Sequence, residues 1–400
     1  NDAPEISLTG TDHDSAALTE TNASLTESGT LTLTDIDVKD AVSTVKVDSI
    51  VKGGTYGGTL PTDGVLKEML SISDGALTDG ETGGKINWNF NSGSEHFDFL
   101  AEGETLTLTY TVKSTDDSGT ANDNDTHEIT ITITGTNSAP VLNNDIVSVI
   151  EDKGLTDDNI HDVATSAANI FDNDTDPDTN GKDLWKVNMA QGSSSTATDI
   201  NTVYTDIKGT YGTLHLKQDG TYTYTLNSNE TNVQELGHDA NVTDSFKIWM
   251  QDGNLPQKSE TLTINISGTN DKPTIGVAAG TSDSAAADVI EGNIVPSDNK
   301  AEATGTLTFS DIDLGDTVKV TKLALSDADF IISGPQDGLI STRAELYDML
   351  TLTDTTFTTA DGTNSHQLIW TFESGDERFN YLKAGETLTL TYKVEAKDDS

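Results

Sequence analysis

One passage of the chain is written twice, and this repetition limits its possible folds more than any other feature. Residues 92–110 read SGSEHFDFLAEGETLTLTY, and residues 374–392 read SGDERFNYLKAGETLTLTY. A repeat of this length indicates an array of one structural unit. Arrays more often set length, spacing or multivalency than build one active site. The question is therefore what the units hold together, and by which contacts.

Closing segments mark where successive units meet. Residues 129–140 (ITITITGTNSAP) close one unit, residues 262–273 (LTINISGTNDKP) close the next, and residues 1–4 (NDAP) match the tail of the same element. We therefore expect units at 1–136, 137–269 and 270–400. The middle unit is divergent. The third resembles the first and is expected to stop before its last strand, as in a fragment of a longer protein.

Within the units, polar and apolar residues alternate as they do in half-buried strands. Residues 105–109 (TLTLT) and 129–134 (ITITIT) alternate strictly, so one face of each strand would be buried. Residues 211–226 predict a hairpin that turns at Asp219-Gly220. Many short strands with regular turn signals predict an all-β chain of tandem β-sandwich domains arranged as an extended rod. Short helical turns are expected at residues 65–70, 229–236 and 343–350.

The charge of the chain restricts its partners. The formal net charge is −45, which disfavours nucleic acid and anionic membrane surfaces. No segment approaches the roughly 20 apolar residues of a membrane-spanning helix, so no membrane insertion is expected. Self-repulsion of this size destabilises compact states, and the chain has no cysteine with which to form disulfides. A divalent cation is the obvious agent of neutralisation and cross-linking.

The carboxylates gather at the predicted unit ends in a recurring order. A glutamate follows each linker, an Asp-x-Asp cluster comes next, an aspartate lies late in the unit, and the linkers add Asn or Asp. In the first unit and its linker these candidate metal ligands are Glu20, Asp35, Asp37, Asp40, Asp116, Asp117 and Asn137. In the middle unit and its linker they are Glu151, Asp152, Asp172, Asp174, Asp176, Asp178, Asp252, Asn270 and Asp271. In the third unit they are Glu291, Asp311, Asp313, Asp316, Asp398 and Asp399.

These residue types suit Ca²⁺, which takes about six to eight oxygen ligands from carboxylates, amides and carbonyls. No single cluster supplies enough ligands, so the ends of adjacent units would have to meet around the ion. A solvated acidic face is the alternative for any one cluster, but recurrence in every unit favours metal. The predicted partners are therefore neighbouring units of the same monomeric chain, joined through calcium-bound linkers.

Other kinds of site have weaker support. The histidines lack zinc-ligand spacing, and the acidic residues recur in end loops instead of surrounding one cleft, so we do not expect an enzyme. Trp88 and Trp370 recur in Trp-x-Phe segments, where core packing is favoured over stacking on a sugar. A glycan-binding module of a surface protein remains the alternative function. Exposed tryptophan rings beside a groove would support it.

Two segments, residues 28–37 (SGTLTLTDID) and 304–313 (TGTLTFSDID), resemble VCBS-type repeats together with the Gly-Thr-Asn linkers. The middle unit, with FDNDTDPD at 171–178, is similar to the cadherin-like variety of these repeats. The resemblance implies immunoglobulin-like extender domains of a large RTX-type adhesin, exported by type I secretion to the bacterial cell surface and active in adhesion and biofilm formation. It also implies calcium at the junctions. Asn137-Ser138 departs from the usual Asn-Asp of the linker.

Overall fold

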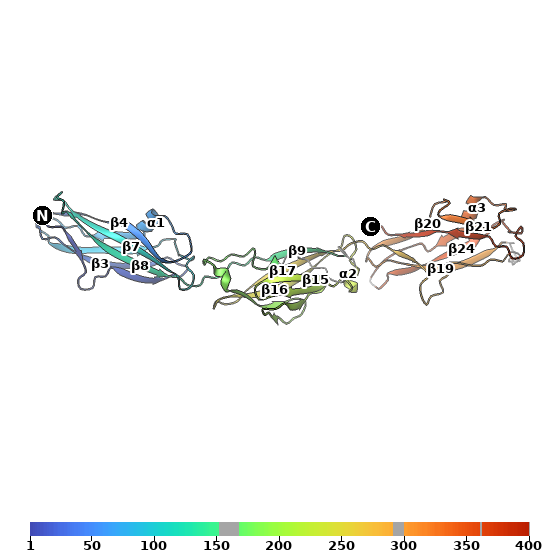
Figure 1. Ribbon diagram of the computed structural model, residues 1–400, viewed down its shortest axis with the longest axis horizontal. Coiled ribbons are helices and arrows are strands. Elements are labelled where there is room, and N and C mark those ends of the chain that lie inside the picture. The colour runs from blue at the N-terminus through green and yellow to red at the C-terminus, as the bar shows by residue number, and fades with distance from the viewer. Residues whose placement is uncertain (152–167, 291–299, 361, 400) are drawn as a thin grey trace.

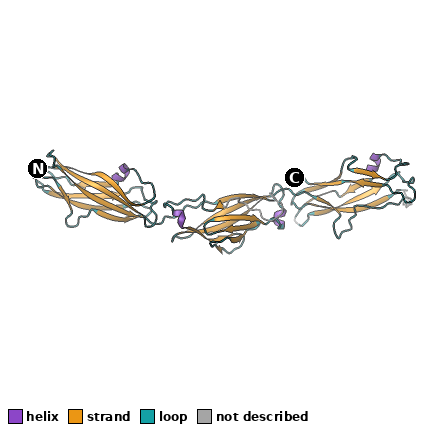
Figure 2. Cartoon of the chain, in the orientation of Figure 1, coloured by secondary structure: helices purple, strands orange, loops and turns teal. Residues whose placement is uncertain are grey.

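The computed structural model of the chain describes residues 1–151, 168–290, 300–360 and 362–399. Within these residues strands predominate and helices are few, which confirms the predicted all-β class (Figure 2). The strands form three successive groups, which lie end to end in Figure 1, and no sheet of the described residues mixes strands from two groups. We call the groups β1–β8, β9–β17 and β18–β26 the first, middle and third units.

The first unit consists of two four-stranded sheets. One has the order β1 (Glu5–Ser7), β3 (Thr26–Thr34), β6 (Gly83–Asn91) and β5 (Leu70–Asp74). The other has the order β2 (Ser15–Thr19), β8 (Asn124–Thr134), β7 (Thr105–Asp116) and β4 (Val42–Thr55). Every second residue of β7, from Leu106 to Val112, is buried in a core that also contains Trp88 and Phe90. The alternation of Thr and Leu thus forms one apolar face, as the pattern predicts.

The middle unit pairs a four-stranded sheet with a five-stranded one. The smaller sheet runs β10 (Ala168–Asn169), β15 (Thr221–Leu226), β14 (Gly212–Leu216) and β13 (Thr205–Lys208). The larger runs β12 (Thr198–Asp199), β11 (Trp185–Gln191), β16 (Asn241–Asp252), β17 (Lys258–Ser267) and β9 (Asp145–Ile150). The predicted hairpin is confirmed, because β14 and β15 pair antiparallel around the Asp219-Gly220 turn. Aromatic and aliphatic side chains from both sheets share one core.

The third unit repeats parts of the first. One sheet has the order β18 (Thr274–Gly276), β19 (Glu302–Ser310), β24 (Ser365–Glu373) and β22 (Leu350–Thr353). The remaining strands pair as β23 (Thr356–Thr358) with β20 (Thr317–Lys322) and β26 (Val394–Lys397), and as β21 (Phe330–Ser333) with β25 (Thr389–Tyr392). The short helices α1 (Asp63–Glu68), α2 (Thr231–Gln234) and α3 (Arg343–Asp348) occur where helical turns were predicted, and a 3-10 turn, η1 (Gly181–Leu184), precedes β11.

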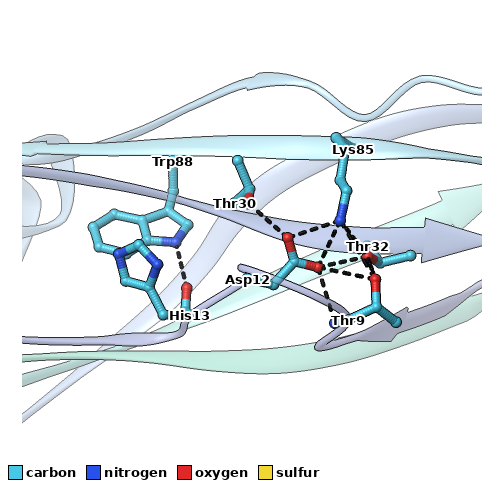
Figure 3. Close-up of polar contacts among 7 residues, drawn as sticks. All are labelled: Thr9, Asp12, His13, Thr30, Thr32, Lys85 and Trp88. Carbon is cyan, nitrogen blue, oxygen red and sulfur yellow. Dashed lines mark hydrogen bonds and ion pairs between the residues drawn. The ribbon is translucent and has the colours of Figure 1, made fainter.

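The loop that crosses from β1 in one sheet to β2 in the other is held by a buried aspartate (Figure 3). The Asp12 carboxylate accepts hydrogen bonds from the Thr30 and Thr32 hydroxyls of β3, at 2.6 and 2.5 Å. It also accepts from the Thr9 amide at 3.0 Å and from the Lys85 ammonium of β6 at 2.8 Å. These contacts fix the crossover against the sheet.

The third unit contains the same device with one change. The Asp283 carboxylate accepts from the hydroxyls of Thr306 and Thr308, at 2.7 and 2.6 Å. Gln367, at 3.0 Å, takes the place that Lys85 has in the first unit. The recurrence indicates that the crossover loop is a conserved part of the sandwich within this chain.

In the first and middle units, a strand near the start of the unit runs parallel to its last strand. In the first unit β2 pairs parallel with β8, from Ser15 opposite Thr130 to Thr19 opposite Thr134. In the middle unit β9 pairs parallel with β17 over six positions. In the middle unit the chain enters near the start of β9 and leaves from the end of β17, so tension on the two ends would shear this ladder along its length. In the first unit β1 precedes β2 and pairs antiparallel with β3.

Candidate metal sites at the unit ends

Each unit begins with an asparagine that takes part in the same set of three contacts. The Asn side-chain amide lies against the late aspartate of its unit. The next residue donates its backbone N–H to the second aspartate of the Asp-x-Asp segment, and that aspartate donates its own N–H to the first. The first aspartate of each Asp-x-Asp thus closes an Asx-type turn, and the carboxylate of the second aspartate reaches the linker. In the middle unit the other oxygen of Asp176 accepts from the Trp185 indole N–H at 2.8 Å.

The distances are similar in all three places. At the first unit they are Asn1 to Asp116 3.4 Å, Asp2 to Asp37 2.6 Å and Asp37 to Asp35 2.9 Å. At the middle unit they are Asn137 to Asp252 3.0 Å, Ser138 to Asp178 2.8 Å and Asp178 to Asp176 2.9 Å. At the third unit they are Asn270 to Asp398 3.5 Å, Asp271 to Asp313 2.7 Å and Asp313 to Asp311 3.1 Å.

A glutamate from the preceding unit completes the first junction. The N–H of Glu20 extends the β2–β8 ladder by donating to the Thr134 carbonyl at 2.8 Å. Its carboxylate is buried and accepts from the Thr136 hydroxyl at 2.5 Å. Burial and the neighbouring Asp98 carboxyl raise the pKa of Glu20. The Glu20 charge thus lies in the linker, on the side of the first unit that faces the middle unit.

Glu151 has the corresponding position at the second junction. Its N–H donates to the Ser267 carbonyl at 2.9 Å. Its carboxylate is fully buried and accepts from the Thr269 N–H at 3.2 Å and from the Gln234 side chain at 3.3 Å. Both glutamates are therefore held by the last strand and the linker of their own unit.

Direct backbone contacts bring consecutive units together at both junctions. The N–H and hydroxyl of Thr179 both donate to the Phe99 carbonyl, each at 3.1 Å. At the second junction the Leu314 N–H donates to the Glu235 carbonyl, also at 3.1 Å. In each case the donor follows the Asp-x-Asp segment and the acceptor lies in an end loop of the unit before.

This proximity concentrates like charges. Burial raises the pKa of the Asp178 carboxyl to about 7, and the charges of Asp176, Asp252 and Glu20 contribute to the rise. Burial likewise raises the pKa of Asp313 to about 7, with contributions from Asp271, Asp311 and Asp316. In both cases a backbone N–H bond to the carboxylate opposes the rise without cancelling it. At the first junction the Lys258 charge opposes the rise in the pKa of Asp252 without cancelling it, so the described residues leave an excess of negative charge there.

Several oxygens at these junctions are buried without a donor. Asp178 is 5% exposed and Asp313 is 0% exposed, and in each carboxylate Oδ1 has no hydrogen-bond partner. The same holds for oxygens of the other junction residues Asp98, Asn137, Asp252, Asn270 and Asp311. An unpaired buried carboxylate oxygen is costly, whereas amide and carboxylate oxygens are the ligands that Ca²⁺ prefers. The residues present therefore fit a calcium ion by type and by their need for a cation.

The carboxylates do not already form a compact metal centre. Across the described residues, no group of three or more His, Asp or Glu side chains has an arrangement that could hold a metal ion as it stands. Binding would require the side chains to rotate toward a common point. The backbone hydrogen bonds fix where these side chains start.

The other predicted ligands lie in different places. Asp40 and Asp117 lie beside the Asp-x-Asp of the first unit, since Asp117 accepts from the Ala41 N–H at 3.0 Å. Asp399 accepts from the Thr317 N–H at 2.8 Å, next to Asp316. Asp172 and Asp174 lie farther into the middle unit, near Asp145. Asp152 and Glu291 fall outside the described residues. Sequence reasoning missed Asp98, although its second copy, Asn380, has an oxygen-bearing side chain at the same place of the repeat.

The tryptophans do not support the glycan alternative. Trp88 is 1% and Trp370 8% exposed, so neither ring is available as a stacking platform. Each indole N–H donates to a carbonyl of the crossover loop, from Trp88 to His13 and from Trp370 to Ser284. In addition, no helix among the described residues is long and apolar enough to cross a membrane.

Comparison with known proteins finds a family match for the middle unit. A family model described as a bacterial cadherin-like domain matches residues 137–268, and this part of the chain has a cadherin-like fold. No curated protein matches the chain. Among solved structures, protocadherin gammaB7 EC3-6 is 11% identical, with 98% of this chain and 77% of that chain covered and a TM-score of 0.40. Mouse cadherin-23 EC22-24 is 10% identical, with 98% of each chain covered and a TM-score of 0.32. Scores this low carry no further argument.

Proposed function

We propose that this chain is the calcium-rigidified extender region of a secreted bacterial surface adhesin, in which β-sandwich units 1–136, 137–269 and 270–400 project a distal binding domain for adhesion and biofilm formation. A bacterial cadherin-like domain fits an extracellular repeat region of the adhesion type. The observation that carries the proposal is the three-contact set at every unit start, combined with buried oxygens that lack donors at both junctions.

The ligand sets follow from the contacts. At the first junction we assign calcium to Glu20, Asn137, Asp176, Asp178 and Asp252. At the second we assign it to Glu151, Asn270, Asp271, Asp311, Asp313 and Asp398. Extracellular calcium is millimolar, so sites of even modest affinity would be filled. Each bound ion would neutralise carboxylates from two units and fix the angle between them, and it would also add folding stability by mass action.

The strand order suits an extender. The parallel pair β9–β17 joins the first and last strands of the middle unit, and β2–β8 joins the second and last strands of the first unit. A pull along the rod would load all hydrogen bonds of such a ladder together instead of opening them one at a time. This arrangement supports a mechanical role for the units.

Small-angle X-ray scattering with and without a chelator tests the proposal on the full chain. In calcium we expect the dimensions of a stiff rod, and in chelator a broader distribution of maximum dimension because repulsion between junction carboxylates loosens the angles. Asp313→Asn should loosen the second junction in calcium. Asp199→Asn is the matched control, because it removes the same charge from an exposed position on the edge strand β12. Unchanged dimensions and an unchanged melting temperature in chelator would rule the proposal out.

A further inference from the structure

Three acidic side chains meet inside the middle unit, away from the residues assigned to the junctions. Asp145 begins β9 and Glu260 lies near the start of β17, while Asp174 comes from the loop before η1. Glu260 is in phase with Leu262, Ile264 and Ile266, so it occupies a core-facing position of its strand. An acidic residue at the end of an apolar face requires a partner.

That partner is missing within the described residues. Glu260 is 3% exposed and neither of its carboxylate oxygens has a hydrogen-bond donor. Asp174 is equally buried, and its Oδ2 is unpartnered, as is the Oδ2 of Asp145. The Lys182 ammonium, whose charge opposes the rise in the pKa of Asp174, donates to the Phe171 carbonyl and lies over the Trp185 ring. It therefore does not pair with the three carboxylates.

The first unit shows what normally occupies this place. Glu20 and Glu151 correspond, as do Thr134 and Ser267, because each glutamate donates its N–H to that carbonyl. Counting back along the paired strands, Asp145 corresponds to Asp14 and Glu260 to His127. In the first unit these two residues pair directly, since His127 Nε2 lies 3.0 Å from Asp14 Oδ2.

The middle unit therefore has an acceptor, the Glu260 carboxylate, where the first unit has the donor His127.

The third carboxylate, that of Asp174, is also specific to the middle unit. Asp174 lies four residues before Asp178, and the residue four before the matching Asp37 is the buried Leu33. Burial and the neighbouring carboxylates raise the pKa of Glu260, and burial raises that of Asp145 to about 7, again with contributions from nearby carboxylates. Both rises reflect negative charge crowded without compensation.

We infer that Asp145, Asp174 and Glu260 bind a divalent cation inside the middle unit once their side chains rotate toward a common point, since they do not form a compact centre as they stand. The ion is of the hard type that prefers carboxylate oxygens, with calcium as the probe. The ion supplies the positive charge that His127 can provide in the first unit. It bridges β9, β17 and the loop that leads to Asp176 and Asp178, so it stiffens the side of the unit on which the first junction is built. The site is separate from the junction ions and does not depend on them.

Calcium stoichiometry of the full chain, measured by isothermal titration after complete decalcification, tests this inference. Glu260→His recreates the pair already present between Asp14 and His127, so this variant is expected to fold. Glu260→Gln keeps the shape of the side chain and removes its charge. Each variant should bind one calcium ion fewer per chain than the original protein, with the rod dimensions in calcium unchanged.

A second measurement separates an ion site from a merely protonated cluster. Without calcium both variants should melt higher than the original chain, because a buried repulsion has been removed, and in saturating calcium this advantage should disappear or reverse. Terbium luminescence sensitised by Tyr222, which lies near Asp145, should fall in Tyr222→Phe. Unchanged stoichiometry in Glu260→His, or terbium luminescence that does not depend on Tyr222, overturns the inference. A different outcome would contradict the proposed function alone: Glu260→His binds one calcium ion fewer, but the rod dimensions are the same with and without calcium.

Discussion

Asp12 offers the most direct test of how the sandwich is held together. Its side chain has no exposed surface, and it accepts hydrogen bonds from Thr9, Thr30, Thr32 and Lys85. Asp12→Asn keeps the size of the group but leaves one acceptor oxygen and no charge. We expect the first unit to lose stability, with the crossover loop released from β3 and β6.

The magnitude follows from the contacts. A hydrogen bond to a charged group contributes about 1.5–3 kcal/mol. The four donors share one carboxylate, so their contributions do not add, and Lys85 is half exposed and can return to water. We therefore expect a loss of about 2 kcal/mol. For a unit of roughly 130 residues, an unfolding entropy of about 2.1 cal/mol/K per residue converts this loss to about 7 °C.

The assay is calorimetry of the full chain in saturating calcium, with hydrogen exchange of the segment around Asp12 to assign the affected transition. Asp283→Asn is the internal comparison. Asp283→Asn should lower the stability of the third unit by less than Asp12→Asn lowers that of the first, because Gln367 donates to Asp283 without a charge. Equal melting of Asp12→Asn and the original chain would refute the hydrogen-bond argument, and an equal cost for both variants would refute the role given to Lys85.

The pH dependence of the Asp12 effect has a definite sign. Burial alone would raise the pKa of this carboxyl, but hydrogen bonds from Lys85, the two threonine hydroxyls and Thr9 outweigh it and hold the pKa well below its ordinary value. The ionised form therefore stabilises the folded state above the unfolded pKa of about 4, and this stability is lost as pH falls through the folded pKa. The difference in urea midpoint between the original chain and Asp12→Asn should shrink from pH 5 to pH 2.

Two further substitutions test the packing of single units. Asp244→Asn should destabilise the middle unit by about 2–3 kcal/mol. The buried Asp244 carboxylate accepts hydrogen bonds from the consecutive backbone amides of residues 210–212 and from the Tyr224 hydroxyl at 2.7 Å. Urea unfolding measures the loss of stability, and an unchanged unfolding midpoint would contradict this prediction. Gly29→Ala should destabilise the first unit by about 1–3 kcal/mol, because the new methyl group would overlap the Trp88 ring. Gly305→Ala should do the same at Trp370 in the third unit, and a stable variant at either glycine would show that the ring can move.

The sequence was sufficient for the architecture because the signals are local. Alternation of Thr with Leu or Ile predicts a buried face directly, and β7 and β8 have that face. The link between Asn137, Asp178 and Asp252 was also accessible, because the same residue types recur at every unit start. Because the same residues recur at every unit start, the sequence indicated that they lie close together, which a single copy could not show.

The internal carboxylate cluster could not be predicted in this way. Asp145 and Glu260 are far apart in sequence, and each is a single acidic residue at the edge of an alternating strand, where a solvent-facing position is the ordinary expectation. The alternation of β17 puts Glu260 in phase with Leu262, but only the structure brings Asp145 of the parallel strand β9 and Asp174 of a distant loop close to it. Asp172 and Asp174 illustrate the same limit, since the run of aspartates from 172 to 178 gives no sign of where one cluster ends and the next begins.

The arrangement of ions and strands has a mechanical consequence. In a rod under tension every unit and every junction carries the same force, so the element that yields fastest determines the extension. Forced unfolding depends on the unfolding rate, and a ladder sheared along its length has no single bond that can open first. The parallel pairs β2–β8 and β9–β17 therefore protect the first and middle units. Across the described part of the junctions, backbone hydrogen bonds join Thr179 to Phe99 and Leu314 to Glu235, and an agent that neutralises the carboxylates around them would strengthen both joints. If calcium is that agent, its removal should soften the rod at its joints long before any sandwich unfolds.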